Sequence, residues 1–174
     1  MGDEVWYATI VGVIVLSGLC IFSILYLAKM RRTKTNAAWK QAATELGLDF
    51  TPVTRIFGKY RMSGVIGKQL SCSVWAYTEP NGQGGYTTFM NYDVRFPQRL
   101  NKVKELLTPN IQSKLLEVNN VLKKVVVSDD SVNSIGMHGF IRKSEILIQN
   151  VKLLIQLAEL IIPNEEVDSI FEEI

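Results

Sequence analysis

The sequence predicts an α+β fold in which one N-terminal transmembrane helix precedes a small domain. Residues 5–28 form a run of 24 residues without a charged side chain. Residues 69–78 and 86–96 alternate between two sets of side chains, which is typical of strands in an antiparallel sheet. Residues 145–162 carry apolar side chains around nearly the whole circumference of a helix. We therefore expect an antiparallel meander, a β-hairpin and a long C-terminal apolar helix behind the transmembrane helix.

Length and composition agree with one domain and one membrane segment. The chain has 174 residues, of which 47% are hydrophobic, and its mean hydropathy is slightly positive. A chain that gives about 30 residues to a membrane segment keeps enough for one packed core. The only two cysteines, Cys20 and Cys72, cannot form a disulfide framework, which fits a reducing compartment.

The run over residues 5–28 is long enough to cross a bilayer. In a helix it extends about 36 Å, more than the roughly 30 Å of a hydrocarbon core. Aromatic residues at its two ends are expected to anchor it at the membrane interfaces: Trp6, Tyr7 and Tyr26. A cleaved signal peptide would need a basic start, a shorter apolar stretch and a cleavage site, which this segment lacks.

The charges that flank the run predict its orientation. Acidic Asp3 and Glu4 precede it, and four basic residues follow it directly: Lys29, Arg31, Arg32 and Lys34. Because positive charge is retained in the cytoplasm, residues 1–4 should lie outside and the C-terminal domain inside. The sequence thus predicts a single-pass protein of the cell inner membrane, with membrane lipid as a partner.

Two small residues in the run are spaced for a contact with another helix. Ala8 and Gly12 lie four positions apart, a spacing that allows close helix approach in membranes. The pair is a candidate site for a helix–helix contact, although such pairs also occur by chance in membrane helices.

The cytoplasmic domain is expected over residues 36–162. After a basic juxtamembrane break at 29–35, a helix should cover 36–46 and end at Gly47. Strands are expected at 55–62, 69–78 and 86–96, with turns at Ser63-Gly64 and Gly67-Lys68 and a Gly-rich loop at 81–85.

The second half of the domain should be a hairpin between helices. A short helix is expected at 101–107, and Thr108-Pro109 should start another that runs to about Val118. The expected hairpin has strands at 122–127 and 132–141 around a turn at 128–131. Ser144 should cap the closing helix, and an acidic tail follows at 163–174.

One resemblance covers residues 105–162. Glu105-Leu106-Leu107-Thr108-Pro109, then Leu115-Leu116, a short hairpin and a closing aliphatic helix resemble a pattern in poorly characterised bacterial membrane-anchored proteins. The resemblance implies a bacterial α+β domain. It transfers no functional residue.

Few residues of the sequence indicate a catalytic, cofactor-binding or metal-binding site. Cys72 and His138, the only imidazole, form the one conceivable nucleophile and base, although a buried strand cysteine explains Cys72 more simply. No Cys/His spacing fits a zinc site, and no cofactor is expected. The Gly-rich loop 81–85 lacks the Walker pattern and joins two strands. If this loop has a role, we expect a protein contact through Tyr77 and Tyr86, which flank it.

The charge distribution is uneven. Residues 29–143 hold 18 basic against 8 acidic residues, whereas residues 163–174 hold five acids and no base. The basic surplus suits an anionic membrane surface or a solvated face, and no nucleic-acid module accompanies it. The tail places four apolar residues on one helical face, where they are expected to meet the domain itself, a partner or solvent: Val167, Ile170, Phe171 and Ile174.

Together these features favour a non-enzymatic, membrane-anchored interaction or assembly subunit, an accessory component that binds other membrane protein subunits. One alternative is a cytoplasmic module that binds the anionic membrane surface. Another is an enzyme with an unrecognised site, using Cys72.

Overall fold

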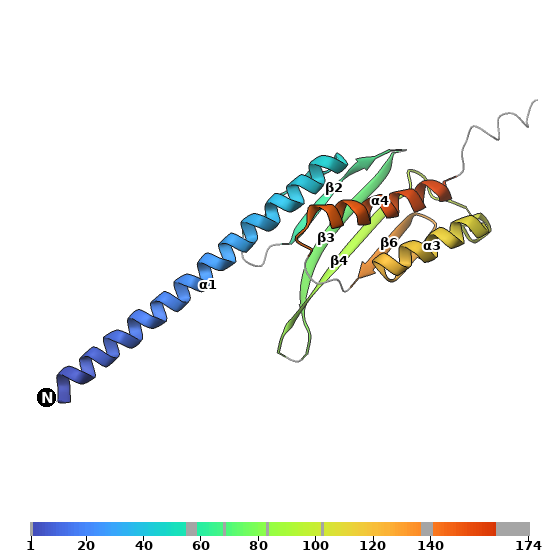
Figure 1. Cartoon of the computed structure of the whole chain (residues 1–174). Coiled ribbons are helices and arrows are strands. Elements are labelled where there is room, and N and C mark those ends of the chain that lie inside the picture. The colour runs from blue at the N-terminus through green and yellow to red at the C-terminus, as the bar shows by residue number, and fades with distance from the viewer. Residues whose placement is uncertain are drawn as a thin grey trace, which may run out of the picture.

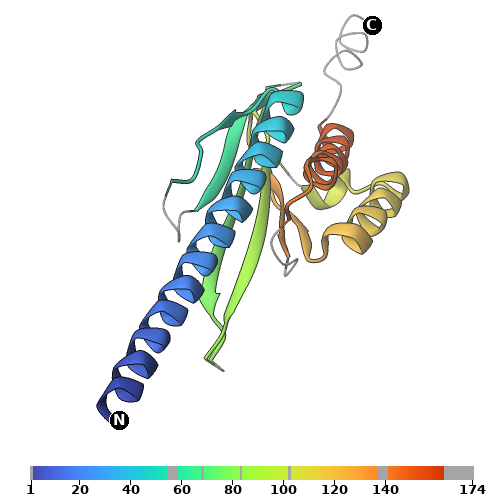
Figure 2. The same cartoon turned by 60° about the vertical axis from the view of Figure 1, so that its left-hand side comes forward.

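A long helix leads into a six-stranded sheet that carries helices on one face (Figure 1, Figure 2). This computed structural model describes residues 2–54, 59–67, 69–82, 84–101, 103–136 and 141–162, without the side chains of residues 2–5, 8 and 104. The α+β class predicted from the sequence is confirmed, with one long apolar N-terminal helix and a C-terminal helix.

Helix α1 (Gly2–Leu46) is continuous, so the expected break at residues 29–35 is wrong. That segment contains neither Gly nor Pro, and its Lys, Arg and Met residues favour a helix. The predicted end at Gly47 is confirmed. Gly47 has φ +69°, and the amide of Leu48 donates to the carbonyl of Ala43 at 2.8 Å. This Schellman arrangement satisfies the last carbonyls of the helix.

The sheet has the order β1-β2-β3-β4-β6-β5, and every neighbouring pair is antiparallel. Its strands are β1 (Asp49–Phe50), β2 (Tyr60–Ile66), β3 (Leu70–Pro80), β4 (Tyr86–Arg95), β5 (Val125–Val127) and β6 (Ser131–Gly136). The predicted meander is confirmed as β2 to β4, and β1, which was not expected from the sequence, pairs with β2 at its edge. The predicted hairpin is also present, and pairing of β4 with β6 joins it to the meander in one sheet.

Several expected boundaries are wrong. Ser63-Gly64 is no turn but lies inside β2, where Ser63 pairs with Ser73. Helix α3 (Pro109–Leu122) continues past the expected end at Val118, because Val118 and Leu122 are both buried on one face of the helix. Ser144 is the first residue of α4 (Ser144–Ile161) rather than its cap, and no side chain caps this helix.

Other expected features are confirmed or lie outside the described residues. The Thr108 hydroxyl accepts from the amide of Ile111 at 3.5 Å, as an N-cap does. Helix α2 (Val103–Leu106) falls in the expected segment. The start of the strand expected at 55–62 and the end of that expected at 132–141 include residues outside the described part of the chain.

The core lies between one face of the sheet and three helical segments, the end of α1, α3 and α4. Side chains from alternate positions of β2, β3 and β4 point into it, including Met62, Val74 and Tyr92. Helix α4 and the last three turns of α1 cover them, with Trp39 and Leu154 fully buried. The closing helix thus packs centrally on the sheet, which explains its apolar residues on nearly all sides. Helix α1 therefore ends inside the core of the domain.

Candidate functional site

The first part of α1 exposes an apolar surface. Trp6, Tyr7 and Tyr26 are 70%, 72% and 55% exposed, and the aliphatic residues between them are exposed as well. Within the described residues, one helix is long and apolar enough to cross a membrane, and it lies near the N-terminus. The structure is thus consistent with single-pass membrane anchoring.

A groove lies where α1 leaves this apolar part and passes the β3–β4 hairpin. Its volume is about 880 Å³. Five cations line it, from three separate parts of the chain: Lys29, Arg31, Arg32, Lys59 and Arg142. None of the described lining residues is acidic. We call this feature the basic groove; its remaining lining residues are Leu25, Ala28, Thr35, Tyr60, Ala76, Tyr77, Thr78, Tyr86 and Thr88.

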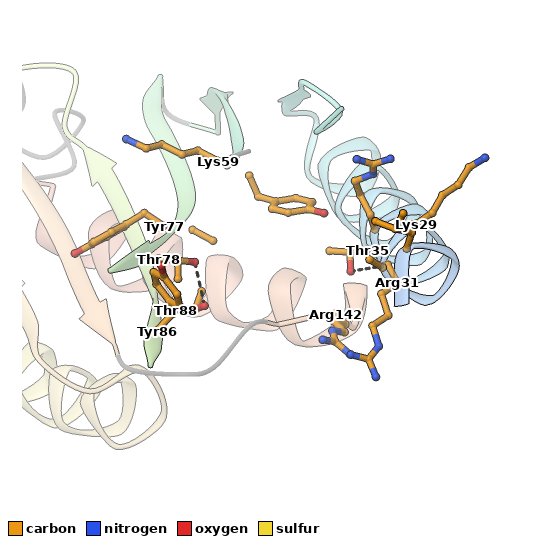
Figure 3. Close-up of a pocket in the computed structure, with 14 residues that line it drawn as sticks. Lys29, Arg31, Thr35, Lys59, Tyr77, Thr78, Tyr86, Thr88 and Arg142 are labelled. Atoms are coloured by element: carbon orange, nitrogen blue, oxygen red, sulfur yellow. Dashed lines mark hydrogen bonds between the residues drawn. The ribbon is translucent and has the colours of Figure 1, made fainter. Parts of the chain in front are cut away.

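The cations of the basic groove do not all point into it. In Figure 3, Lys29 and Lys59 extend outward on opposite sides, whereas the side chains of Arg31 and Arg142 extend toward the same end of the groove. The Arg32 Nη1 donates to the carbonyl of Thr54 at 2.6 Å and so fixes the loop before β2 against α1. Arg31 and Arg142 are therefore the cations best placed to meet a ligand.

Tyr60 forms the floor of the basic groove. Its side chain is 8% exposed and packs on Trp39, with ring centroids 5.4 Å apart. Burial raises the pKa of Tyr60, while the positive charges of Arg32 and Arg142 act in the opposite direction. The field of these arginines thus reaches the floor of the groove. Thr35 is buried beside it, and its hydroxyl donates to the Arg31 carbonyl at 3.0 Å.

The far part of the β3–β4 hairpin, residues 77–89, is called here the hairpin arm. It extends from the domain toward the N-terminal part of α1 (Figure 1, Figure 2). Thr78 and Thr88 face each other across the arm, with their hydroxyls 3.2 Å apart. Tyr86 is 73% exposed. Tyr77 belongs to the opposite face of the arm and stacks on Phe89, with ring centroids 5.3 Å apart.

The sheet face that the helices leave open is polar and partly covered by its own large side chains. A shallower groove there is lined by Lys59, Arg61, Ser71, Ser73, Trp75, Asp93 and Arg95. Arg95 Nε pairs with Asp93 at 2.9 Å. The indole of Trp75 donates to the Asn91 side-chain oxygen at 3.1 Å when that amide takes the orientation that satisfies both groups. Unlike the basic groove, this groove has an acidic residue in its lining, and Asp93 pairs with one of the three cations there.

The structure brings together only part of the residues singled out from the sequence. Lys29, Arg31, Arg32, Tyr77 and Tyr86 line one groove, while Lys34 is exposed and lies outside that lining. A side chain added at Gly12 would meet nothing within 4 Å, so this position is open to a neighbouring helix. Some predicted contact residues lie outside the described side chains: Ala8, Val167, Ile170, Phe171 and Ile174.

Cys72 is poorly suited to act as a nucleophile. Its side chain is 1% exposed under the helices. Burial, helped by the negative charge of Asp93, raises the pKa of the thiol to about 12. The reactive thiolate is therefore almost absent at neutral pH. His138 lies outside the described residues. Across the described part of the chain, no three His, Cys, Asp or Glu residues gather as metal ligands.

Lys59, Tyr60 and Arg142 belong to the basic groove although the sequence did not single them out. The basic surplus of residues 29–143 was visible, but not which cations meet. Arg142 lies more than 100 positions from Arg31, and only the packing of α4 beside α1 brings them to one groove.

Comparison with protein-family models, with curated proteins and with solved structures gave no match. The resemblance of residues 105–162 to bacterial membrane-anchored proteins therefore stays a prediction.

Proposed function

We propose that this protein is a membrane-anchored, non-enzymatic interaction subunit, an accessory component of a membrane protein complex. The observation that carries the proposal is the continuity of α1 from its exposed apolar part into the domain core, where Trp39 is fully buried. A flexible tether would suffice to keep a domain near a membrane. A continuous helix also fixes its height and direction, which matters when neighbours must meet at one level.

The proposed orientation follows from the charges at the two ends of the apolar segment. Basic residues lie where α1 enters the domain, and acidic ones precede the segment. The domain would then lie on the cytoplasmic face of the inner membrane, with the N-terminus outside. In this placement the hairpin arm points back toward the bilayer.

The hairpin arm is the proposed contact with another membrane protein subunit. Tyr86 is highly exposed, and Tyr77 and Phe89 form a stacked apolar patch on the other side of the arm. Aromatic side chains of this kind are enriched in protein interfaces. The arm's position near the end of the apolar segment supports a partner that is itself in the membrane.

Photo-crosslinking in native membranes tests the proposal. A photoreactive amino acid replaces Tyr86, and the matched control carries it at Leu116, which is 66% exposed on α3. We expect a discrete crosslinked membrane protein from position 86 and not from position 116. Identical crosslinking patterns from both positions would contradict the proposed subunit. So would the absence of any crosslinked protein from position 86.

A second candidate function is binding of the anionic membrane surface. The unbalanced positive charge of the basic groove supports it. This function is compatible with the first, because a subunit can hold both a lipid and a neighbour.

A further inference from the structure

We infer that the basic groove is a binding site for one anionic phospholipid, with the lipid phosphate between Arg31 and Arg142 and an acyl chain along Leu25 and Ala28. The inference rests on the membrane anchoring proposed above and adds a defined ligand to it.

The first argument is the position of the groove along α1. Its lining begins at Leu25 and Ala28, inside the apolar segment, and continues to Thr35 in the domain. These positions span about 15 Å of helix, which is enough to pass from hydrocarbon through the headgroup layer. An occupant must therefore be apolar at one end and polar at the other, as a phospholipid is.

The second argument is the positive charge of the groove, which no acidic residue of its described lining balances. Ion pairs elsewhere in the described residues join a cation to a carboxylate, as between Arg95 and Asp93 or Lys152 and Glu45. Arg31 and Arg142 instead line one groove, and the described lining holds no acid. Two guanidinium groups that share a groove repel, and a phosphate that accepts from both would remove the repulsion.

The third argument concerns the other groups of the groove. The hydroxyls of Thr78 and Thr88 and the exposed Tyr86 lie across from the arginines and offer neutral donors to a polar headgroup (Figure 3). An acidic peptide is the competing occupant, but the apolar lining by Leu25 and Ala28 would lie in lipid and favours an acyl chain.

The test measures lipid binding by the full chain in nanodiscs or mild detergent. Native mass spectrometry would count bound phosphatidylglycerol against phosphatidylcholine during a titration. The test variant is Arg31→Gln/Arg142→Gln. The matched control, Lys40→Gln/Lys124→Gln, loses the same charge at exposed positions outside the groove. Circular dichroism checks that each variant is folded, and Arg31→Lys/Arg142→Lys keeps the charge without the planar fork.

We expect the wild type to retain phosphatidylglycerol over phosphatidylcholine. The double glutamine variant should bind phosphatidylglycerol about 30-fold more weakly, from two lost charges near the membrane surface. The surface control should bind like the wild type, and the lysine variant should fall between.

Other outcomes would overturn the inference. These are equal retention of both lipids, an equal loss in the groove variant and the surface control, complete displacement by millimolar inorganic phosphate, and displacement by a peptide of residues 163–174. Each would leave the proposed subunit intact, because crosslinking at position 86 is measured separately. A chain that fails to enter nanodiscs would instead contradict the anchoring and, with it, this inference.

Discussion

The indole Nε1 of Trp39 donates a hydrogen bond of 3.2 Å to the carbonyl oxygen of Ile141. The two residues lie on α1 and on the segment before α4, 102 positions apart in the chain. The same indole packs on Tyr60, the floor of the basic groove. The Trp39 side chain therefore links α1 to the segment before α4 and packs against the residue that forms the floor of the basic groove.

Substitution of Trp39 should weaken the packing of α1 on the domain core. Trp39→Ala removes a fully buried side chain and its hydrogen bond, so we expect a loss of about 3–5 kcal/mol in the free energy of unfolding. The control Leu116→Ala, on the exposed side of α3, should change it by less than about 0.5 kcal/mol. Urea unfolding of the full chain in mild detergent, followed by far-UV circular dichroism, measures both. Equal effects would show that Trp39 is no core residue.

A buried hydrogen bond should couple α4 to the sheet. The Asn150 amide nitrogen donates to the Tyr92 hydroxyl at 2.9 Å, and both residues are buried. Tyr92→Phe or Asn150→Leu leaves the other group without its partner and should cost about 1–3 kcal/mol. The double variant should cost less than the sum of the two, by about 0.5 kcal/mol or more. Additive costs in the unfolding experiment would argue that the two groups do not interact.

Alkaline pH should destabilise the domain through two buried groups. Burial raises the pKa of Cys72 from 9.0 to about 12, and that of Tyr92 from 10.0 to about 12. Because the folded state holds these protons more tightly, their contribution is complete below about pH 9 and is lost between pH 9 and 12. Unfolding free energies measured across this range should fall. Cys72→Ala should move the start of the fall toward pH 10, and an unchanged onset would contradict the assignment to Cys72.

The opening at Gly12 should matter to assembly and not to folding. No atom lies within 4 Å of a side chain added there, so Gly12→Leu should leave the unfolding free energy of the domain unchanged. If the expected helix–helix contact forms, the larger side chain should weaken it and reduce crosslinking between transmembrane helices. Gly18→Leu, also open in the structure, provides the comparison. Equal crosslinking in the two variants would remove Ala8 and Gly12 as a specific contact.

Sequence patterns within one strand or helix predicted much of that element's structure. They did not predict features that depend on contacts between residues far apart in the chain. The alternation over residues 69–78 separated the two faces of β3, because period two is a property of a single strand, and the structure buries the face with Leu70, Cys72, Val74 and Ala76. The meander and the hairpin form one sheet because β4 pairs with β6, and no pattern within a single strand encodes this pairing. The basic groove forms because tertiary packing places Arg31, Lys59 and Arg142 in its lining. The basic residues that suggested a break in α1 instead continue the helix.

The distance between a lipid-level and a domain-level position on α1 tests the central claim most directly. Spin labels at residues 19 and 40, both exposed, would be placed in a Cys20→Ala/Cys72→Ala background in nanodiscs. A continuous helix predicts one narrow distribution, with backbone positions about 32 Å apart, measured by pulsed electron spin resonance. Thr33→Pro should broaden or shift it, because proline removes a helical hydrogen bond, whereas Thr33→Ala should not. A broad or much shorter distribution in the unsubstituted helix would contradict a continuous anchor that fixes the domain at the membrane.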